Sequence, residues 1–197
     1  MKKLIQYLPI FLLSLLAGSV VSCKETEAEG EYDNWAKRNV AYIDSIATVA
    51  RTNTDGKWKV VKNWVRPDDK PSTDFGGILT VNNLDYVYIH IEKEGEGKVS
   101  ACYSDSVSVS YRGRLINKTV FDETFVSEEL NPETSGRVTL TLSSLVDGMT
   151  SALQYMHEGD WWTVYIPYES GYGDTNKGSI PAYSTLIFEM YLDKVYP

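Results

Sequence analysis

Apolar and polar side chains alternate along much of the second half of the chain, and this alternation restricts the folds that the sequence can adopt. A period of two is typical of β-strands that bury one face, so each such segment predicts a strand of an antiparallel sheet. Asn117 and Lys118 occupy a position suited to a tight hairpin turn, and Val120 and Phe121 begin a further short strand. The remaining predicted strands cover residues 86–92, 107–111, 138–142, 161–166 and 185–195.

A helical segment lies between these strands. Its apolar residues recur at helical spacing on one face and are Leu145, Met149, Ala152, Leu153 and Met156. Ser144 and Asp147 have the spacing of a capping box, and Gly159 is a natural end for the helix. We therefore expect an α+β fold in which a curved antiparallel β-sheet is wrapped around one short α-helix.

The first 22 residues predict a targeting signal. Lys2 and Lys3 precede an apolar run over residues 4–17, which is short for a membrane span. Small residues then lead to Cys23, a pattern that resembles a bacterial lipoprotein signal in which this cysteine becomes the lipidated first residue. An ordinary cleaved signal and an uncleaved anchor are the alternatives. We expect lipidation at Cys23 and attachment to a membrane of the bacterial cell envelope.

Composition limits the number of cores and the class of partner. A chain of 197 residues with 43% hydrophobic content can bury one main core. It has 27 acidic and 19 basic side chains, which give a formal charge of −8. Nucleic acid is therefore not an expected partner, because phosphate binding needs clustered lysine and arginine.

Cysteine and histidine are too few to build a disulfide framework or a metal site. If Cys23 carries lipid, Cys102 has no partner and is expected to be a small buried apolar residue; otherwise a bridge between the two is conceivable. His90 and His157 lie apart from both cysteines in the sequence. We expect no metal and no cofactor.

An N-terminal extension precedes the alternating segments. Residues 23–32 are rich in glutamate and predict an acidic tether. Asp33 or Asn34 could cap a helix that ends near Arg51, and residues 58–65 predict a strand. Residues 33–84 are expected to pack against the main domain, with a partner-binding arm as the alternative. The apolar stripe expected on the helix consists of Ala36, Val40, Ile43, Ala47 and Ala50, with Trp35, Ile46 and Val49 beside it.

Several short motifs follow one another in a specific order from Tyr86 to Tyr196. They are Val107 to Gly113 (Val-Ser-Val-Ser-Tyr-Arg-Gly), Phe121-Asp122, Leu145-Val146, Gly171-Tyr172-Gly173, Ile180-Pro181 and Phe188. This order resembles that of FKBP-type peptidyl-prolyl isomerases. The resemblance implies an FKBP-like domain over residues 85–197 that follows the helical extension.

The same resemblance implies a site. It places catalytic roles on Tyr111, Asp122 and Tyr172. The substrate-binding residues that it implies are Phe121, Leu145, Val146, Met149, Ile180 and Phe188. Residues with the periodic spacing of Tyr111, Met149 and Phe188, taken alone, are more often core residues than site residues.

The sequence departs from the family pattern at four places. Met149 stands where the family often has a tryptophan, Gly171 replaces an alanine, and Val138 stands where an aromatic residue is usual. We find no counterpart for the arginine that commonly pairs with the aspartate at position 122.

The function that the resemblance implies is peptidyl-prolyl cis-trans isomerisation during the folding of envelope proteins, by a monomer acting on proline-containing polypeptide clients. The alternative from another class is a non-catalytic FKBP-like chaperone or peptide-binding lipoprotein. A third hypothesis places the functional surface at Trp58 and Trp64, since large exposed aromatic side chains mark interaction sites.

Overall fold

The computed structural model describes residues 30–65 and 82–197. Glu31 to Pro197 form one compact unit. The predicted signal at residues 1–22, Cys23 and most of the predicted tether lie outside the described residues, as do residues 66–81. Within the described ranges, no helix combines the length and the apolar character that crossing a membrane would need.

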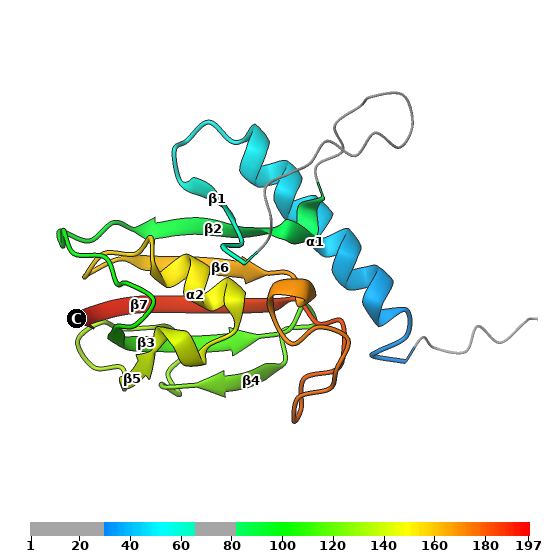
Figure 1. Ribbon diagram of the computed structural model, residues 1–197. Coiled ribbons are helices and arrows are strands. Elements are labelled where there is room, and N and C mark those ends of the chain that lie inside the picture. Colours follow the sequence, from blue (N-terminus) through cyan, green and yellow to red (C-terminus); the bar gives the residue numbers. More distant parts are fainter. Residues whose placement is uncertain (1–29, 66–81) are drawn as a thin grey trace, which may run out of the picture. The chain divides into compact units, whose positions relative to one another are not determined.

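The predicted antiparallel sheet is confirmed and has seven strands (Figure 1). Its order is β1-β2-β6-β7-β3-β4, and β5 also pairs with β3. All pairs are antiparallel. The strands are β1 (Trp58–Lys62), β2 (Tyr86–Lys93), β3 (Ser106–Arg114), β4 (Val120–Glu123), β5 (Val138–Thr141), β6 (Trp161–Ile166) and β7 (Leu186–Tyr196).

β3 is the strand that bends the sheet. Its first half pairs with β5 and its second half with β4, while β7 runs along its other edge. The register shifts between Ser108 and Val109 against β7, and between Gly113 and Arg114 against β4. Irregularities of this kind add local bend and twist to a strand. The sheet can therefore curve around one helix, as the sequence predicted.

That helix is α2 (Asp147–Leu153), which is shorter than the predicted segment. Ser144 does not cap it. This residue ends the 3-10 helix η2 (Leu142–Ser144), and its hydroxyl donates to the Thr141 carbonyl at 2.7 Å. Val146 holds the N-cap position and makes no side-chain cap. The capping-box prediction was wrong because the Ser144 hydroxyl is hydrogen-bonded to a carbonyl of the preceding 3-10 turn and not to the start of α2.

The predicted N-terminal helix is confirmed as α1 (Trp35–Thr52), which lies beside β1 and β2 (Figure 1). Asn34 precedes it in a left-handed conformation (φ 54°) and does not cap it through its side chain. The buried face differs from the predicted stripe, since Asn39 is fully buried while Ala36 and Val40 are only half-buried. The two remaining 3-10 helices are η1 (Asn83–Asp85) and η3 (Tyr168–Ser170).

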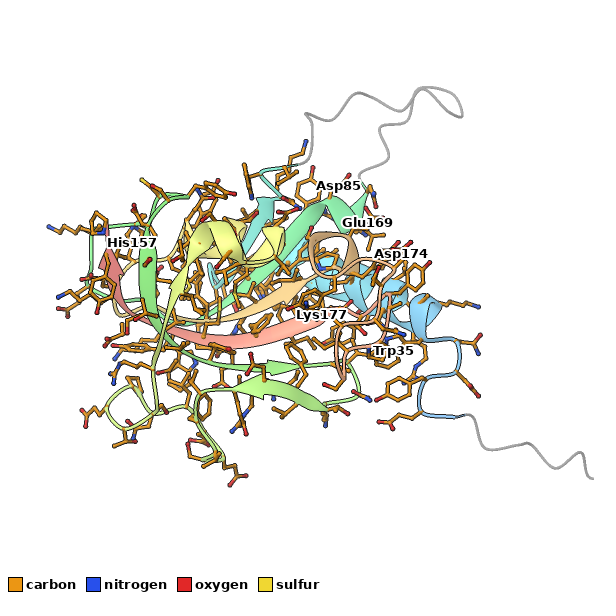
Figure 2. The ribbon with its side chains drawn as sticks, turned by 60° about the horizontal axis from the view of Figure 1, so that its bottom comes forward. Trp35, Asp85, His157, Glu169, Asp174 and Lys177 are labelled. Carbon is orange, nitrogen blue, oxygen red and sulfur yellow. The ribbon has the colours of Figure 1, made fainter. Side chains whose placement is uncertain are left out.

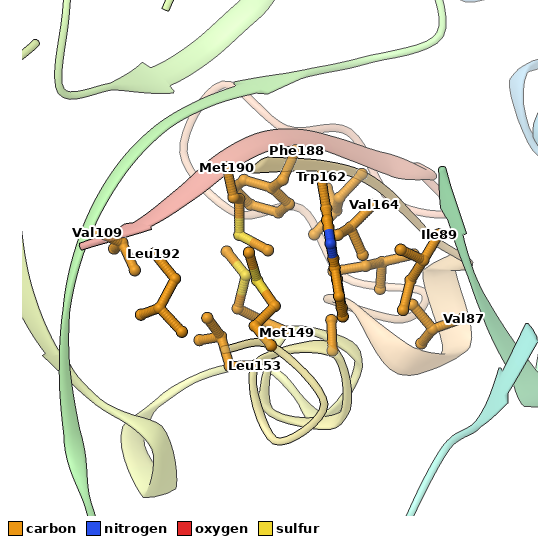
Figure 3. Packing of buried hydrophobic residues seen from close by; sticks show 14 of the residues in the cluster. Val87, Ile89, Val109, Met149, Leu153, Trp162, Val164, Phe188, Met190 and Leu192 are labelled. Carbon is orange, nitrogen blue, oxygen red and sulfur yellow. The ribbon is translucent and has the colours of Figure 1, made fainter. Parts of the chain in front are cut away.

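The two faces of the sheet carry separate hydrophobic clusters. One cluster joins α1 to the sheet through Ile43, Ala47 and Tyr88. The larger one lies between α2 and the opposite face, where Met149 and Leu153 of α2 point toward β7 (Figure 3). Its members on β7 include Phe188, Met190 and Leu192. Alternation along β2 sets this division, because successive side chains point to opposite faces.

Candidate active site

A single cavity of about 500 Å³ gathers all nine residues that the resemblance implied for the site. It lies where β3, β4 and β7 meet the start of α2 and the loop between β6 and β7. Five further residues line it that the sequence analysis missed. The complete lining is Tyr111, Phe121, Asp122, Leu140, Ser144, Leu145, Val146, Met149, Tyr172, Lys177, Gly178, Ser179, Ile180 and Phe188.

Three aromatic rings on paired strands form one side of the cavity. The Phe188 ring centroid lies 5.9 Å from that of Tyr111 and 5.5 Å from that of Phe121, both in edge-to-face geometry. Such pairs are favoured by the quadrupoles of the rings. Gly113 leaves room for them, because a Cβ there would lie 2.5 Å from the Phe121 ring. We call Tyr111, Phe121, Asp122 and Phe188 the strand half of the site.

A tyrosine and a carboxylate form the polar part of the strand half. The Tyr111 hydroxyl donates to Asp122 Oδ2 at 2.6 Å. Burial, followed by this hydrogen bond and the charge of Asp122, raises the pKa of Tyr111 well above its usual value of 10.0. The phenol therefore stays protonated at neutral pH and remains a hydrogen-bond donor.

The start of α2 forms the wall between the two sides. Met149 is 5% exposed and reaches the cavity from the first turn of the helix. Leu145 and Val146 precede that turn. Because Val146 is the N-cap residue, its backbone N–H lies outside the intrahelical ladder. A donor next to apolar side chains can bind a carbonyl of a peptide in the cavity.

The opposite side of the cavity belongs to residues 167–185, which connect β6 to β7 and which we call the flap. Tyr172 lies in it and is 36% exposed. Burial and then the charge of Asp122 raise the pKa of Tyr172, so this phenol also stays protonated at neutral pH. Lys177 and Ile180 exchange two backbone hydrogen bonds of 2.9 Å around Gly178, whose φ is +57°. The flap residues that line the cavity are Tyr172, Lys177, Gly178, Ser179 and Ile180.

Comparison with known proteins places this geometry in a family. Residues 97–193 match the model of the FKBP-type peptidyl-prolyl cis-trans isomerase domain. An FK506-binding protein of Neisseria meningitidis is 37% identical over 105 residues, which are 53% of this chain and 91% of that protein. The chain belongs to the FKBP-type peptidyl-prolyl cis-trans isomerase family.

Two longer relatives match about half of the chain or slightly more. A macrophage infectivity potentiator of Trypanosoma cruzi is 41% identical over 99 residues, which are 50% of this chain and 47% of that protein. A probable isomerase, FkpA, of Neisseria meningitidis is 38% identical over 117 residues, which are 59% of this chain and 39% of that protein. The chain thus spans less than half the length of these relatives.

Solved structures agree on the fold. The crystal structure of a peptidyl-prolyl isomerase from Pseudomonas syringae has a TM-score of 0.55 at 21% identity and covers 86% of this chain and 99% of that one. FkpA of Escherichia coli has a TM-score of 0.55 at 20% identity and covers 84% of this chain and 64% of that one. These similarities support an FKBP-type fold.

Among residues 30–65 and 82–197, no arginine forms an ion pair with Asp122, which differs from the family pattern. Arg112, next to Tyr111 on β3, instead binds Glu123, with Nε and Oε2 2.7 Å apart. Its guanidinium also donates to the carbonyls of Ser127 and Glu128. Tyr111 thus supplies the hydrogen bond to Asp122, and the nearby arginine is bound on the adjacent strand and loop.

The two tryptophans of the extension do not form one surface. Trp58 stacks on Tyr165 at 5.9 Å on the α1 face of the sheet. Trp64 is 51% exposed and packs against Tyr103 at 5.0 Å, and its backbone N–H donates to Ser151 Oγ of α2 at 3.4 Å. The two side chains thus lie on opposite sides of the FKBP-type fold.

Cys102 is exposed, so its expected burial was wrong; it lies in a turn in which Asp105 accepts its N–H. Among residues 30–65 and 82–197, no group of three or more His, Cys, Asp or Glu side chains could hold a metal ion.

Proposed function

We propose that this chain is a peptidyl-prolyl cis-trans isomerase that acts on proline-containing polypeptides. The observation that carries the proposal is the cavity itself: aromatic and aliphatic side chains surround one tyrosine–aspartate hydrogen bond, and a second tyrosine lies opposite on the flap. Family membership supports the reaction class.

The chemistry suits a site of this kind because no covalent bond forms or breaks. Rotation about a peptide bond meets a barrier of about 18–20 kcal/mol, which arises from the loss of amide resonance. A twisted amide carries less charge on its oxygen than a planar one. An apolar cavity that excludes water therefore favours the twisted state over the planar ground state.

Each polar group receives a role in this proposal. Asp122, oriented by the Tyr111 hydroxyl, polarises or orients the twisted amide. The Tyr172 hydroxyl and the Val146 N–H bind carbonyls of the substrate. The proline ring fits among the apolar residues Phe121, Leu145, Met149, Ile180 and Phe188.

The required energy is modest. A thousandfold acceleration needs about 4 kcal/mol of transition-state stabilisation. Desolvation in a cavity of this size and a few placed hydrogen bonds are sufficient for that amount.

We place the protein in a bacterial cell envelope, attached by lipid on Cys23 as a monomer. The arrangement is a signal at residues 1–22, a tether at 23–32, an extension at 33–84 and an isomerase domain at 85–197. One similar protein, from Legionella longbeachae, is named an outer membrane protein. Labelling with an alkyne palmitate in a bacterial host tests the anchor: the full chain should take up label and the Cys23→Ser variant should not.

A second candidate function is a chaperone or peptide-binding lipoprotein with little turnover. The arginine nearest in sequence to Tyr111 binds Glu123 and not Asp122, which favours this candidate, as does the smaller Met149 side chain in the wall. Both functions use the same cavity, and they differ in rate and not in ligand.

An isomerase assay on residues 24–197, which retain the whole compact unit, separates the two candidates. Short peptides that vary in the residue before proline serve as substrates, with an FKBP-pocket ligand as inhibitor. Catalysis well above the spontaneous rate, blocked by that ligand, supports the enzyme. A folded protein that binds the peptides without accelerating them leaves the binding protein.

A further inference from the structure

Both ends of the flap are held by side chains of the N-terminal extension. The flap leaves the sheet after Ile166 and returns at Leu186. Its first stem contains Ser170 and its second contains Ser184 and Thr185, and all three residues are buried. Each stem is hydrogen-bonded to a buried residue that precedes Trp64 in the sequence. Figure 2 shows Trp35 at the N-terminal end of α1, and its labels Asp174 and Lys177 mark the flap.

Trp35 holds the second stem. Its indole Nε1–H donates to Ser184 Oγ at 2.8 Å, and the same hydroxyl donates to the Pro181 carbonyl at 2.6 Å. Pro181 directly follows Ile180, which lines the cavity. The chain of contacts from Trp35 to the cavity therefore passes through one serine hydroxyl.

Asn39 binds the second stem at Thr185, one residue after Ser184. Its side-chain Oδ1 accepts the Thr185 N–H at 2.7 Å, and its Nδ2 donates to the Trp35 carbonyl at 2.8 Å. Asn39 and Thr185 are both fully buried. A buried amide that is satisfied on both sides fixes the distance between α1 and the point where β7 begins.

Asn63, just after β1, holds the first stem. Its Nδ2 donates to Ser170 Oγ at 2.8 Å. Its own position is fixed on both sides, since its N–H donates to the Asp85 carbonyl at 2.9 Å and its Oδ1 accepts the Val65 N–H at 3.0 Å. Ser170 lies two residues before Tyr172, so this contact positions the backbone that carries the flap tyrosine.

We propose that Trp35, Asn39 and Asn63 are positioning residues of the proline site: they hold both stems of the flap and so set how it covers Tyr111 and Asp122. This inference rests on the proposed function of the cavity. A flap held in its binding position needs less ordering when a substrate enters, which improves affinity without new contacts. The extension is then a functional part of the isomerase.

The rest of α1 offers a matched control. Ile43 and Ala47 pack against Tyr88 on the opposite face of the sheet and belong to a different cluster from the cavity. An Ile43→Val change loosens α1 without removing a flap contact. Variants that act only through helix stability should behave like this control.

The experiment uses residues 24–197 with Trp35→Phe, Ser170→Ala and Ile43→Val, assayed well below their melting temperatures. Trp35→Phe keeps one aromatic ring at this position and removes the N–H, and Ser170→Ala removes the acceptor for Asn63. If the held state falls to a fraction of its wild-type population, KM rises by the inverse of that fraction. We expect KM to rise about three- to tenfold in both flap variants with kcat within about twofold, because ground state and transition state lose binding equally.

A double-mutant cycle localises the effect. Combining Trp35→Phe with Ser184→Ala should raise KM no further than Ser184→Ala alone, because the indole acts through that hydroxyl. Wild-type KM in Trp35→Phe and in Ser170→Ala would overturn the inference. So would an equal KM increase in Ile43→Val.

Amide hydrogen exchange gives a readout that does not need turnover. The Gly173 and Tyr183 amides make 2.8 Å hydrogen bonds within the flap. They should exchange about fivefold faster or more in Trp35→Phe than in Ile43→Val, because less of the flap is held closed. If the wild type shows no isomerase activity, the proposed function fails, but this exchange difference still tests the positioning. Equal exchange in the two variants would overturn the positioning even in an active enzyme.

Discussion

The two sides of the cavity are built by different means. On the strand half, β3 and β7 are hydrogen-bonded neighbours, with Gly113 opposite Phe188 and Tyr111 opposite Met190. Backbone ladders thus fix the three rings and Asp122. On the flap, Tyr172 and Ile180 lie in a connection whose stems are held by side chains of the extension.

The shape of the cavity and access to it therefore have separate structural origins in this molecule. The strand half can lose its geometry only if the sheet is disturbed. The flap can move while the sheet stays intact, because its attachments are a few hydrogen bonds. Substitutions on the strand half should therefore affect stability or chemistry, and substitutions on the flap should affect binding.

The largest effect is expected from Phe188→Ala. Phe188 is buried between Tyr111 and Phe121, so its loss removes a ring that belongs both to the core and to the cavity. Urea unfolding should show a loss of about 3–5 kcal/mol, and proline peptides should no longer bind. Ile187→Ala on the other face is the control, and it should destabilise while leaving peptide affinity of the folded protein intact. Normal peptide binding by Phe188→Ala would show that the ring is not part of the site.

Asp122→Ala should act on the chemistry of the strand half. It leaves the sheet intact and removes the carboxylate that Tyr111 binds. We expect turnover to fall about tenfold to a hundredfold, within the range for loss of one electrostatic group. Glu123→Ala, which removes the partner of Arg112 on the same strand, is the matched control. Wild-type turnover in Asp122→Ala would remove this residue from the proposed mechanism.

Tyr172→Phe probes the flap with a smaller change. The ring stays and one hydroxyl is lost, a contribution of about 0.5–1.5 kcal/mol, or roughly two- to tenfold in kcat/KM. Circular dichroism should show an unchanged fold. If rates in both Tyr172→Phe and Asp122→Ala match the wild type, the assignment of the site is wrong.

Alkaline pH should distinguish the two tyrosines by a still smaller effect. Burial and the Asp122 carboxylate raise the pKa of both Tyr111 and Tyr172 above 10.0. The unfolded chain then releases these protons at lower pH than the folded protein. The stabilisation is therefore complete below about pH 10 and is lost as pH rises through the folded pKa values.

Substitution of Tyr111 and of Tyr172 should reduce this alkaline loss of stability by different amounts. Tyr111 also donates a hydrogen bond to Asp122, so Tyr111→Phe should reduce the alkaline loss of stability more than Tyr172→Phe does. Urea unfolding of both variants between pH 9 and 11 measures the difference. Identical pH profiles would contradict the stronger coupling of the strand-half tyrosine.

The sequence predicted the strand half better than the flap for a physical reason. Alternation and the hairpin at Asn117 follow from local backbone geometry, so they identify the strands that carry Tyr111 and Phe188. Leu140 could have been found in the same way, since it shares a face of its strand with Val138. Lys177 and Ser179 have no periodic signal and lie in the cavity because of the turn at Gly178.

The contacts of the extension could not be read from local patterns. Asn39 interrupts an otherwise apolar helix face, and its partner Thr185 lies 146 residues away in the sequence. Trp35 fits an apolar stripe equally well whether or not its N–H has a partner. The failed capping prediction at Ser144 has a related cause, because a neighbouring 3-10 turn engages the same hydroxyl.

The most direct test of the cavity is an NMR titration of ¹⁵N-labelled residues 24–197 with a short peptide that contains one proline, with cis–trans exchange of the peptide followed in the same samples. The account predicts shift changes at both halves, including Asp122, Phe188, Tyr172 and Ile180, together with faster exchange. Shift changes confined to Trp64 and Tyr103, or none anywhere in a folded protein, would contradict it.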